Sequence, residues 1–144
     1  DFSSRNHLET YWPIPFKINQ IIHTTDAPAP IGPYSQAVLA NGFLYISGQI
    51  PINPATGELN LISLKQEAHQ VMRNINAVLL EAGYGFEHIV KTTILLTDMS
   101  LFAEVNEIYG SYFTGNFPAR ETYAVKELPK SVNIEISAIA YKQA

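Results

Sequence analysis

The sequence predicts an α+β fold in which a mixed six-stranded sheet carries two helices on one face, as a two-layer sandwich. Three observations predict it. The segments follow the order β-β-β-α-β-α-β-β, only two stretches have helical periodicity, and an Asn41-Gly42 pair separates two apolar runs. Two helices leave one sheet face without helical cover. If that face is apolar it needs a partner, so the sequence also predicts an oligomer.

The first half of the chain contains three predicted strands. Residues 18–24 read as a short edge strand, and the proline-rich segment 26–33 reads as a loop with restricted dihedral angles. Residues 35–40 and 43–49 flank Asn41-Gly42, whose two residues tolerate positive φ. We therefore expect these two strands to pair as an antiparallel hairpin.

The first helix is predicted at residues 63–82, after a loop at 51–61 that contains two prolines and a glycine. Ser63 is a plausible N-cap with Gln66 completing a capping box, and Gly83 fits the position that ends a helix. Apolar residues recur at the i, i+3, i+4, i+7 spacing of one buried face: Ala68, Val71, Met72, Ile75, Val78, Leu79 and Ala82.

The second half alternates strand and helix. Residues 89–97 are rich in β-branched side chains, which favours a strand. A second helix is predicted at about 100–113, and strands follow at 119–126 and 132–141 around a turn at 128–131. We interpret residues 1–17 as an extension or arm, and residues 18–144 as a single domain.

Composition excludes several classes of chemistry. The chain has 144 residues, a net charge of −4 and no cysteine, so thiolate nucleophiles and Cys-ligated metals are excluded. No apolar run reaches the roughly 18 residues that span a bilayer. We expect a soluble cytoplasmic protein. Nucleic acid is an unfavoured partner, because the lysines and arginines of the chain are not clustered. The four histidines share no metal-ligand spacing, and neither GxGxxG, GxxxxGK[ST] nor GxSxG occurs.

Three polar residues are candidates for a site. Arg120 stands at a predicted strand entrance, where it is either a surface ion-pairing residue or a guanidinium that grips a carboxylate. Glu135 is the single acidic residue of its strand, either solvated or desolvated with a raised pKa suited to proton transfer. Asn106 falls on the apolar stripe of the second helix, where a buried amide more often ties down a loop than binds a ligand.

Six segments together resemble the RidA family, also called YjgF, and the likeness runs from about residue 19 to the C-terminus. The set includes a long PAR…LP…IEI pattern in the correct order. The segments are IGPYSQA (31–37), YISGQIP (45–51), IVKTTILLTDM (89–99), FxxVNEIYxxYF (102–113), FPAR (117–120) and LPKxVxIEI (128–136).

The resemblance implies a chorismate-mutase-like fold and a homotrimer with sheets facing inward and sites between subunits. It implies hydrolysis of 2-imino acids such as 2-iminobutanoate and 2-iminopropanoate, or their enamine tautomers, to 2-oxo acids and ammonia, with no metal or cofactor. Carried over by position, Arg120 clamps the substrate carboxylate, and Glu135 positions the attacking water, with proton exchange as a secondary role. The other implied pocket residues are Tyr34, Ser47, Gly48, Asn106 and Thr122.

One residue departs from the family pattern. Many members have a small residue directly after PAR, where this chain has Glu121. Because side chains alternate along a strand, we expect Glu121 to point away from the pocket. If it faced Arg120 instead, it would compete with substrate for the guanidinium. Thr122 stands where many members have cysteine. The 51–66 loop varies within the resembled family, so its pocket-lining residues cannot be carried over to this chain.

Two other functions stay open at this point. The same pocket could bind a ligand for regulation without turnover, and RNA cleavage or translation inhibition is also attributed to the resembled family. Retention of both Arg120 and Glu135 favours catalysis, whereas the acidic balance and the lack of a basic aromatic surface weigh against direct RNA binding. A chaperone would need an exposed apolar patch.

Overall fold

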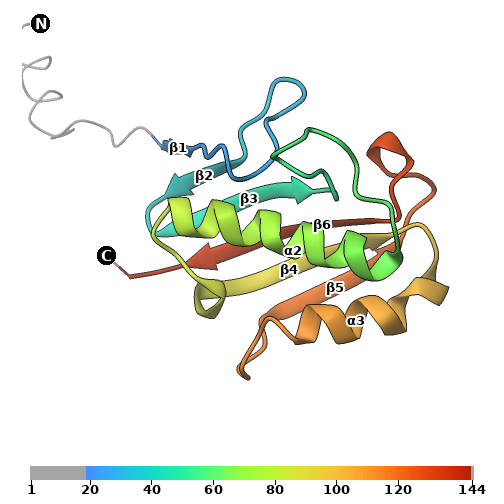
Figure 1. Ribbon diagram of the computed structural model, residues 1–144. Coiled ribbons are helices and arrows are strands. Elements are labelled where there is room, and N and C mark those ends of the chain that lie inside the picture. The colour runs from blue at the N-terminus through green and yellow to red at the C-terminus, as the bar shows by residue number, and fades with distance from the viewer. Residues whose placement is uncertain (1–18, 144) are drawn as a thin grey trace, which may run out of the picture.

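The computed structural model describes residues 19–143 and shows the predicted order of elements (Figure 1). Residues 1–17, expected to form an arm, lie outside the described part. Six strands and two α-helices make up the body. They are β1 (Gln20–Ile22), β2 (Ala37–Ala40), β3 (Phe43–Gln49), α2 (Leu64–Glu81), β4 (Ile89–Leu96), α3 (Phe102–Gly110), β5 (Ala119–Ala124) and β6 (Ile134–Tyr141), with short 3-10 turns at Phe86–His88, Met99–Leu101 and Pro129–Ser131.

All six strands form one sheet in the order β1-β2-β3-β6-β4-β5. Every neighbouring pair is antiparallel except β4 with β5, which run parallel. The predicted hairpin between β2 and β3 is confirmed. Asn41 has φ 52° and Gly42 has φ 86°, as a tight two-residue hairpin turn requires. The mixed sheet is therefore the predicted one, with β5 as its edge next to α3.

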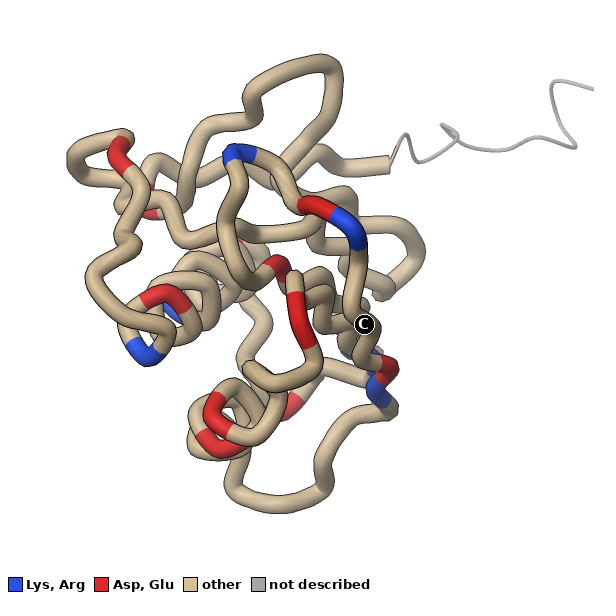
Figure 2. The backbone as a smooth tube through the Cα atoms, turned by 90° about the vertical axis from the view of Figure 1, so that its right-hand side faces the viewer, with Lys and Arg blue, Asp and Glu red and all other residues tan. Residues whose placement is uncertain are grey.

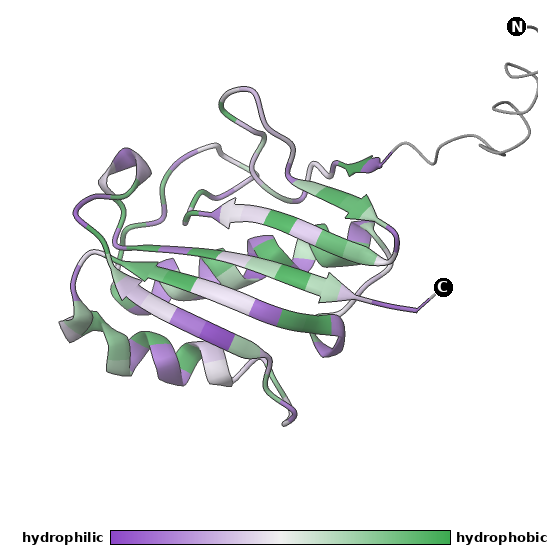
Figure 3. Cartoon of the chain, turned by 180° about the vertical axis from the view of Figure 1, so that it is seen from behind, coloured by the Kyte–Doolittle hydropathy of each residue, from purple (hydrophilic) through white to green (hydrophobic). Residues whose placement is uncertain are grey.

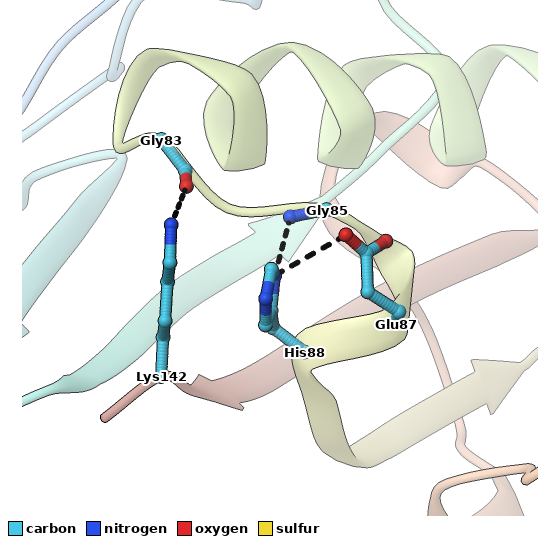
Figure 4. A network of polar contacts seen from close by, with 5 residues as sticks. All are labelled: Gly83, Gly85, Glu87, His88 and Lys142. Atoms are coloured by element: carbon cyan, nitrogen blue, oxygen red, sulfur yellow. Dashed lines mark hydrogen bonds and ion pairs between the residues drawn. The ribbon is translucent and has the colours of Figure 1, made fainter. Parts of the chain in front are cut away.

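Helix α2 begins and ends where its sequence signals predict. The Ser63 hydroxyl accepts a hydrogen bond from the Gln66 N–H at 3.1 Å, and Gly83 ends the helix with φ 79°. Figure 4 shows Lys142 donating to the Gly83 carbonyl at 2.9 Å, which fastens the end of the chain to the end of α2. In the same view His88 Nδ1 accepts from the Gly85 N–H at 2.9 Å and lies 3.6 Å from a Glu87 carboxylate oxygen.

Helix α3 is shorter than predicted. It is preceded by a 3-10 turn at Met99–Leu101, which Asp98 caps by accepting from the Ser100 N–H at 2.7 Å. It ends at Gly110 and not at about 113. The Ser111 hydroxyl donates to the Ile108 carbonyl at 2.6 Å, and such a local side-chain bond competes with continuation of the helix.

The hydrophobic core lies between the helices and one face of the sheet (Figure 1). Large fully buried side chains come from both layers: Leu44, Ile94, Leu96, Ile134 and Ile136 from the strands, and Met72, Ile75 and Leu79 from α2. Each such side chain stabilises the fold by about 1.5–3 kcal/mol relative to exposure. The predicted two-layer α+β sandwich is confirmed.

The other face of the sheet has no helix over it among the described residues, as the view from behind shows (Figure 3). Large apolar side chains stay exposed on it: Ile21, Phe43, Tyr45, Tyr123 and Tyr141. We call this surface the open face. In the described part of the chain, no helix is long and apolar enough to cross a membrane.

Candidate functional site

Arg120 lies at the start of the edge strand β5, next to helix α3, and its side chain is exposed. The guanidinium Nη1 donates to the Asn106 side-chain oxygen at 2.6 Å. Its central carbon also lies 5.4 Å from the centre of the Phe102 ring and 5.3 Å from that of the Tyr109 ring. The arginine therefore has a defined place against α3 instead of extending into solvent.

The structure corrects the expectation for Asn106. The apolar stripe suggested a buried amide that ties down a loop, but Asn106 is exposed and its partner is Arg120. The reason is that α3 lies beside the edge strand, so this part of its stripe faces the strand entrance and not the core (Figure 1). A side-chain oxygen at this position accepts a hydrogen bond from the guanidinium and orients it.

A hollow of about 420 Å³ opens beside the guanidinium. It is lined by Asn106, Tyr109, Gly110, Phe117, Pro118 and Arg120. The walls are mostly apolar, and the arginine supplies the one full charge in the lining. Pockets with apolar walls and a few polar groups are typical of small-molecule sites, where the polar groups fix orientation.

Glu135 is the second residue of β6, lies on the open face, and is half-buried. Burial raises the pKa of its carboxyl above the usual range for glutamate. The carboxyl group packs directly on Gly48, where an added Cβ would come within 2.7 Å of the Glu135 Cδ. Gly48 has no left-handed backbone, so the close approach is what requires a glycine there.

Ser47 and Tyr34 lie in the neighbourhood of Gly48. The pairing of β3 with β6 is irregular between Ile46 and Gln49, which is where Ser47 and Gly48 fall. The Ser47 hydroxyl donates to the Ser35 carbonyl at 2.6 Å, and so ties the strand to the loop that carries Tyr34. The Tyr34 side chain is 51% exposed and its hydroxyl accepts from the Ile31 N–H at 3.2 Å.

The predicted site residues fall into two groups on opposite faces of the sheet. Arg120 pairs with Thr92, whose hydroxyl hydrogen-bonds Tyr109 of α3 at 2.8 Å, so Arg120 shares the helix-covered face. Glu135 pairs with Leu95, an odd number of residues from Thr92, and so points to the open face. We call Arg120, Asn106 and Thr122 the Arg120 group, and Glu135, Gly48, Ser47 and Tyr34 the Glu135 group. One chain does not bring the groups together.

Thr122 shares the face of Arg120, two residues along β5. It pairs with Ile94, whose side chain is in the core. The Thr122 hydroxyl oxygen is buried and has no hydrogen-bond partner among the residues that the structure describes. The threonine thus occupies an apolar setting, which a less polar side chain such as cysteine would also fit.

Glu121 points away from Arg120, as the alternation along the strand predicted. Its carboxylate receives bonds from Lys91 at 2.9 Å, from the Tyr123 hydroxyl at 3.0 Å and from the Thr93 hydroxyl at 3.3 Å, all on the open face. The hydrogen bond from Lys91 is the main cause that lowers the pKa of Glu121. The guanidinium of Arg120 is therefore free of this carboxylate.

The aromatic neighbours of Arg120 were not predicted as site residues. Phe102 and Tyr109 were read as part of the apolar stripe of the second helix, which is the ordinary role for such spacing. Phe117 was read only as part of a segment match. The signal that could have found them is a polar residue, Asn106, at i+4 from Phe102 on the same stripe.

A sequence model of the family described as Endoribonuclease L-PSP matches residues 24–142. The chain belongs to this family, RidA/YjgF. A RutC family protein of Pyrococcus horikoshii is 50% identical to it over 126 residues, covering 88% of this chain and 100% of the relative. A human protein named 2-iminobutanoate/2-iminopropanoate deaminase is 50% identical over 123 residues, covering 85% of this chain and 90% of its own.

Solved structures of RidA/YjgF proteins share the fold. A Rid family protein from Yersinia pestis superimposes with a TM-score of 0.85 at 50% identity, covering 87% of this chain and 100% of its own. The Escherichia coli protein TdcF, solved with bound serine, superimposes with a TM-score of 0.83 at 38% identity, covering 86% and 99%. The chorismate-mutase-like arrangement that the resemblance implied is confirmed.

Proposed function

We propose that this family member hydrolyses reactive 2-imino acids and their enamine tautomers, 2-iminobutanoate and 2-iminopropanoate among them, to 2-oxo acids and ammonia. The observation that carries the proposal is the Arg120 guanidinium, oriented by Asn106 beside a hollow of about 420 Å³. A planar guanidinium held in one orientation can donate two parallel hydrogen bonds, which suits the carboxylate shared by all of these substrates. The human relative named as a deaminase for these imines, 50% identical, supports the same reaction.

The proposed reaction adds water to the C=N bond. Arg120 holds the substrate carboxylate, and Glu135 takes a proton from the attacking water as its oxygen bonds to the imine carbon. Glu135 returns that proton to the nitrogen of the resulting carbinolamine. The C–N bond then breaks to release ammonia, and the hydroxyl proton passes to the Glu135 carboxylate as the C=O bond of the 2-oxo acid forms. A half-buried carboxyl with a raised pKa is suited to accept and return that proton. The imine carbon is already electrophilic, so orientation supplies much of the acceleration.

The remaining pocket residues have supporting roles in this proposal. The Gly48 backbone and the Ser47 and Tyr34 side chains line the site beside Glu135, and Asn106 and the Thr122 backbone complete it beside Arg120. Because the two groups lie on opposite faces of one sheet, a complete site needs both groups from different chains. We infer a homotrimer with open faces inward, in which the Arg120 group of one subunit meets the Glu135 group of its neighbour.

Exposed aromatic and aliphatic side chains on the open face support the assembly, because contiguous apolar surface of this kind is usually buried against a partner. Light scattering of the full chain tests it directly. The expected mass in solution is three times that of one chain. A mass of one chain at micromolar concentration would contradict the trimer.

The activity is tested by generating 2-iminobutanoate in the presence of the protein and following its disappearance. The imine forms when a pyridoxal-phosphate dehydratase acts on threonine, and its decay in buffer gives the background rate. We expect the protein to shorten the imine's lifetime in proportion to its concentration. A decay equal to that in buffer would refute the deaminase assignment.

Ligand binding without turnover is the main alternative, and the serine bound to TdcF is the observation that favours it. Under this alternative the Arg120 group would bind small carboxylates and the imine would decay at the buffer rate. Calorimetry with 2-oxobutanoate, run beside the imine assay, separates the two functions. Binding together with acceleration supports the enzyme, whereas binding alone supports a regulatory role.

RNA cleavage is favoured by two descriptions, that of the family model and that of a Thermotoga maritima structure as an endoribonuclease. Figure 2 shows the lysines and arginines standing singly among acidic residues on the side that it presents. Phosphate backbones are bound by clustered cations, so this distribution does not suit RNA. A salt-sensitive complex with RNA in a filter-binding assay would revive this function.

A further inference from the structure

The Arg120 side chain is exposed but is contacted from several sides by one helix. Its guanidinium lies over the Phe102 ring and over the Tyr109 ring, and its Nη1 donates to Asn106. Phe102, Asn106 and Tyr109 are at positions i, i+4 and i+7 of α3. Residues with this spacing lie on one face of a helix over two turns. A long exposed arginine ordinarily samples many rotamers, and contacts of this kind limit that freedom.

The two rings and the amide act on different parts of the guanidinium. Aromatic rings attract the faces of the planar cation, whereas the amide oxygen accepts from one N–H at its edge. Asn106 accepts from one N–H, and the guanidinium makes no other hydrogen bond among the described residues, so its remaining edge N–H groups are available. A carboxylate is bound through those edge groups by two parallel hydrogen bonds. The arrangement therefore sets the plane in which a carboxylate can approach.

Tyr109 is itself held in place by the sheet. Its side chain is only 4% exposed, its hydroxyl bonds Thr92 of β4 at 2.8 Å, and its ring packs on Phe113 with centroids 4.9 Å apart. Burial raises the pKa of the Tyr109 hydroxyl, so this group stays neutral near pH 7. Through Thr92 and Tyr109, the guanidinium is positioned relative to β4 and not only relative to α3.

We propose that Phe102 and Tyr109 are positioning residues that hold the plane of the Arg120 guanidinium for in-plane capture of a substrate carboxylate. The proposal rests on the proposed function for the identity of the substrate, but its core claim concerns the binding of carboxylates. Neither ring needs to touch the ligand. Both act through the arginine, and their contribution is to reduce the freedom that the arginine loses when the ligand binds.

The first test replaces Phe102 with leucine, which keeps an apolar side chain of similar position and removes the ring. We expect the KM for 2-iminobutanoate to rise about tenfold with kcat within about twofold, since a carboxylate clamp holds ground state and transition state alike. The Kd for 2-oxobutanoate, measured by calorimetry, should rise by the same factor. Tyr109→Phe keeps the ring and loses only the bond to Thr92, so we expect an increase below about threefold.

The second test asks whether Phe102 acts through the guanidinium. In an Arg120→Lys background, the lysine ammonium still attracts a carboxylate. It is not planar, so an aromatic ring has no plane to hold in one orientation. We expect Phe102→Leu to change the Kd for 2-oxobutanoate by less than about twofold there. Phe86→Leu is the matched control, because Phe86 packs on Tyr112 and Phe113 of the same aromatic cluster and does not contact Arg120. It should leave KM and Kd unchanged.

The outcomes separate this inference from the proposed function. If the wild-type protein binds 2-oxobutanoate but hydrolyses no imine, and Phe102→Leu still weakens binding, the positioning role stands and the deaminase assignment fails. An undiminished effect of Phe102→Leu in the Arg120→Lys background would overturn the positioning role. So would an unchanged Kd in Phe102→Leu, or a wild-type protein that binds no carboxylate at all.

Discussion

Arg120 and Glu135 lie on opposite faces of the same sheet and in contrasting environments. Arg120 is exposed at the edge strand, with its guanidinium over the Phe102 ring of α3 and bonded to Asn106. Glu135 is half-buried in the middle of the sheet, where desolvation raises the pKa of its carboxyl. The difference teaches that one group is arranged to keep its charge and its direction, and the other to exchange a proton.

The largest expected effect comes from removing the fixed charge. Arg120→Ala should lower kcat/KM for 2-iminobutanoate by at least about a hundredfold, because a charge-assisted pair in a partly desolvated site is worth several kcal/mol. Steady-state kinetics measure it, and light scattering should show an unchanged oligomer. Arg73→Ala removes an exposed arginine on α2 and is the matched control. Wild-type kinetics in Arg120→Ala would refute the site assignment.

Removing the titratable carboxyl of Glu135 should act mainly on kcat. Glu135→Gln keeps the size of the side chain and removes its ability to take a proton, so kcat should fall about a hundredfold with a small change in KM. The acid side of the wild-type pH profile should reflect the raised pKa of Glu135, so activity should be lost at a higher pH than for an ordinary glutamate. Glu58→Gln, in an exposed loop, serves as control. A fall in affinity alone would assign Glu135 to binding.

Gly48 offers a way to move Glu135 without removing it. In Gly48→Ala the new Cβ would come within 2.7 Å of the Glu135 Cδ, and the carboxyl group is the part free to shift. We expect kcat to fall about tenfold while the fold is retained, because small displacements of a reacting group cost orders of magnitude. Adding Glu135→Asp, which shortens the side chain, should restore part of the rate. Equal kcat in Gly48→Ala and wild type would show that this contact is unimportant.

Glu135 should also cost stability. Its folded pKa lies above its unfolded value, so the cost is absent below the unfolded pKa and complete above the folded one. Glu135→Gln should therefore raise the melting temperature slightly at pH 8 but leave it unchanged near pH 3. Thermal unfolding at both pH values and one fixed protein concentration measures this. A variant less stable than wild type at pH 8 would contradict the desolvation argument.

The smallest effect is expected at Glu121. It pairs with Lys91 on the open face, away from the guanidinium of Arg120. Glu121→Gln should therefore leave the KM for 2-iminobutanoate within about twofold of wild type, since the Glu121 carboxylate bonds Lys91 and not the guanidinium. Steady-state kinetics decide the point. A fall in KM of tenfold or more would mean that Glu121 competes with substrate for Arg120.

Much of the fold could be predicted because its signals are local. Apolar residues at helical spacing predict α2, an Asn-Gly pair predicts the hairpin between β2 and β3, and alternation along β5 predicts that Glu121 points away from Arg120. The early end of α3 could not be predicted from its stripe, because apolar spacing does not encode the bond from the Ser111 hydroxyl to the Ile108 carbonyl found there.

The sequence by itself determined the family, the order of elements and the candidate residues of the site, because motifs and periodicity are properties of neighbouring residues. Only the tertiary structure decided how those residues are grouped. It placed α3 beside the edge strand, which exposed Asn106 and joined it to Arg120. It also set the register of β5 and β6 against β4, which puts Arg120 and Glu135 on opposite faces of the sheet. Such placement depends on strand pairing over long sequence separations, which a local pattern does not encode.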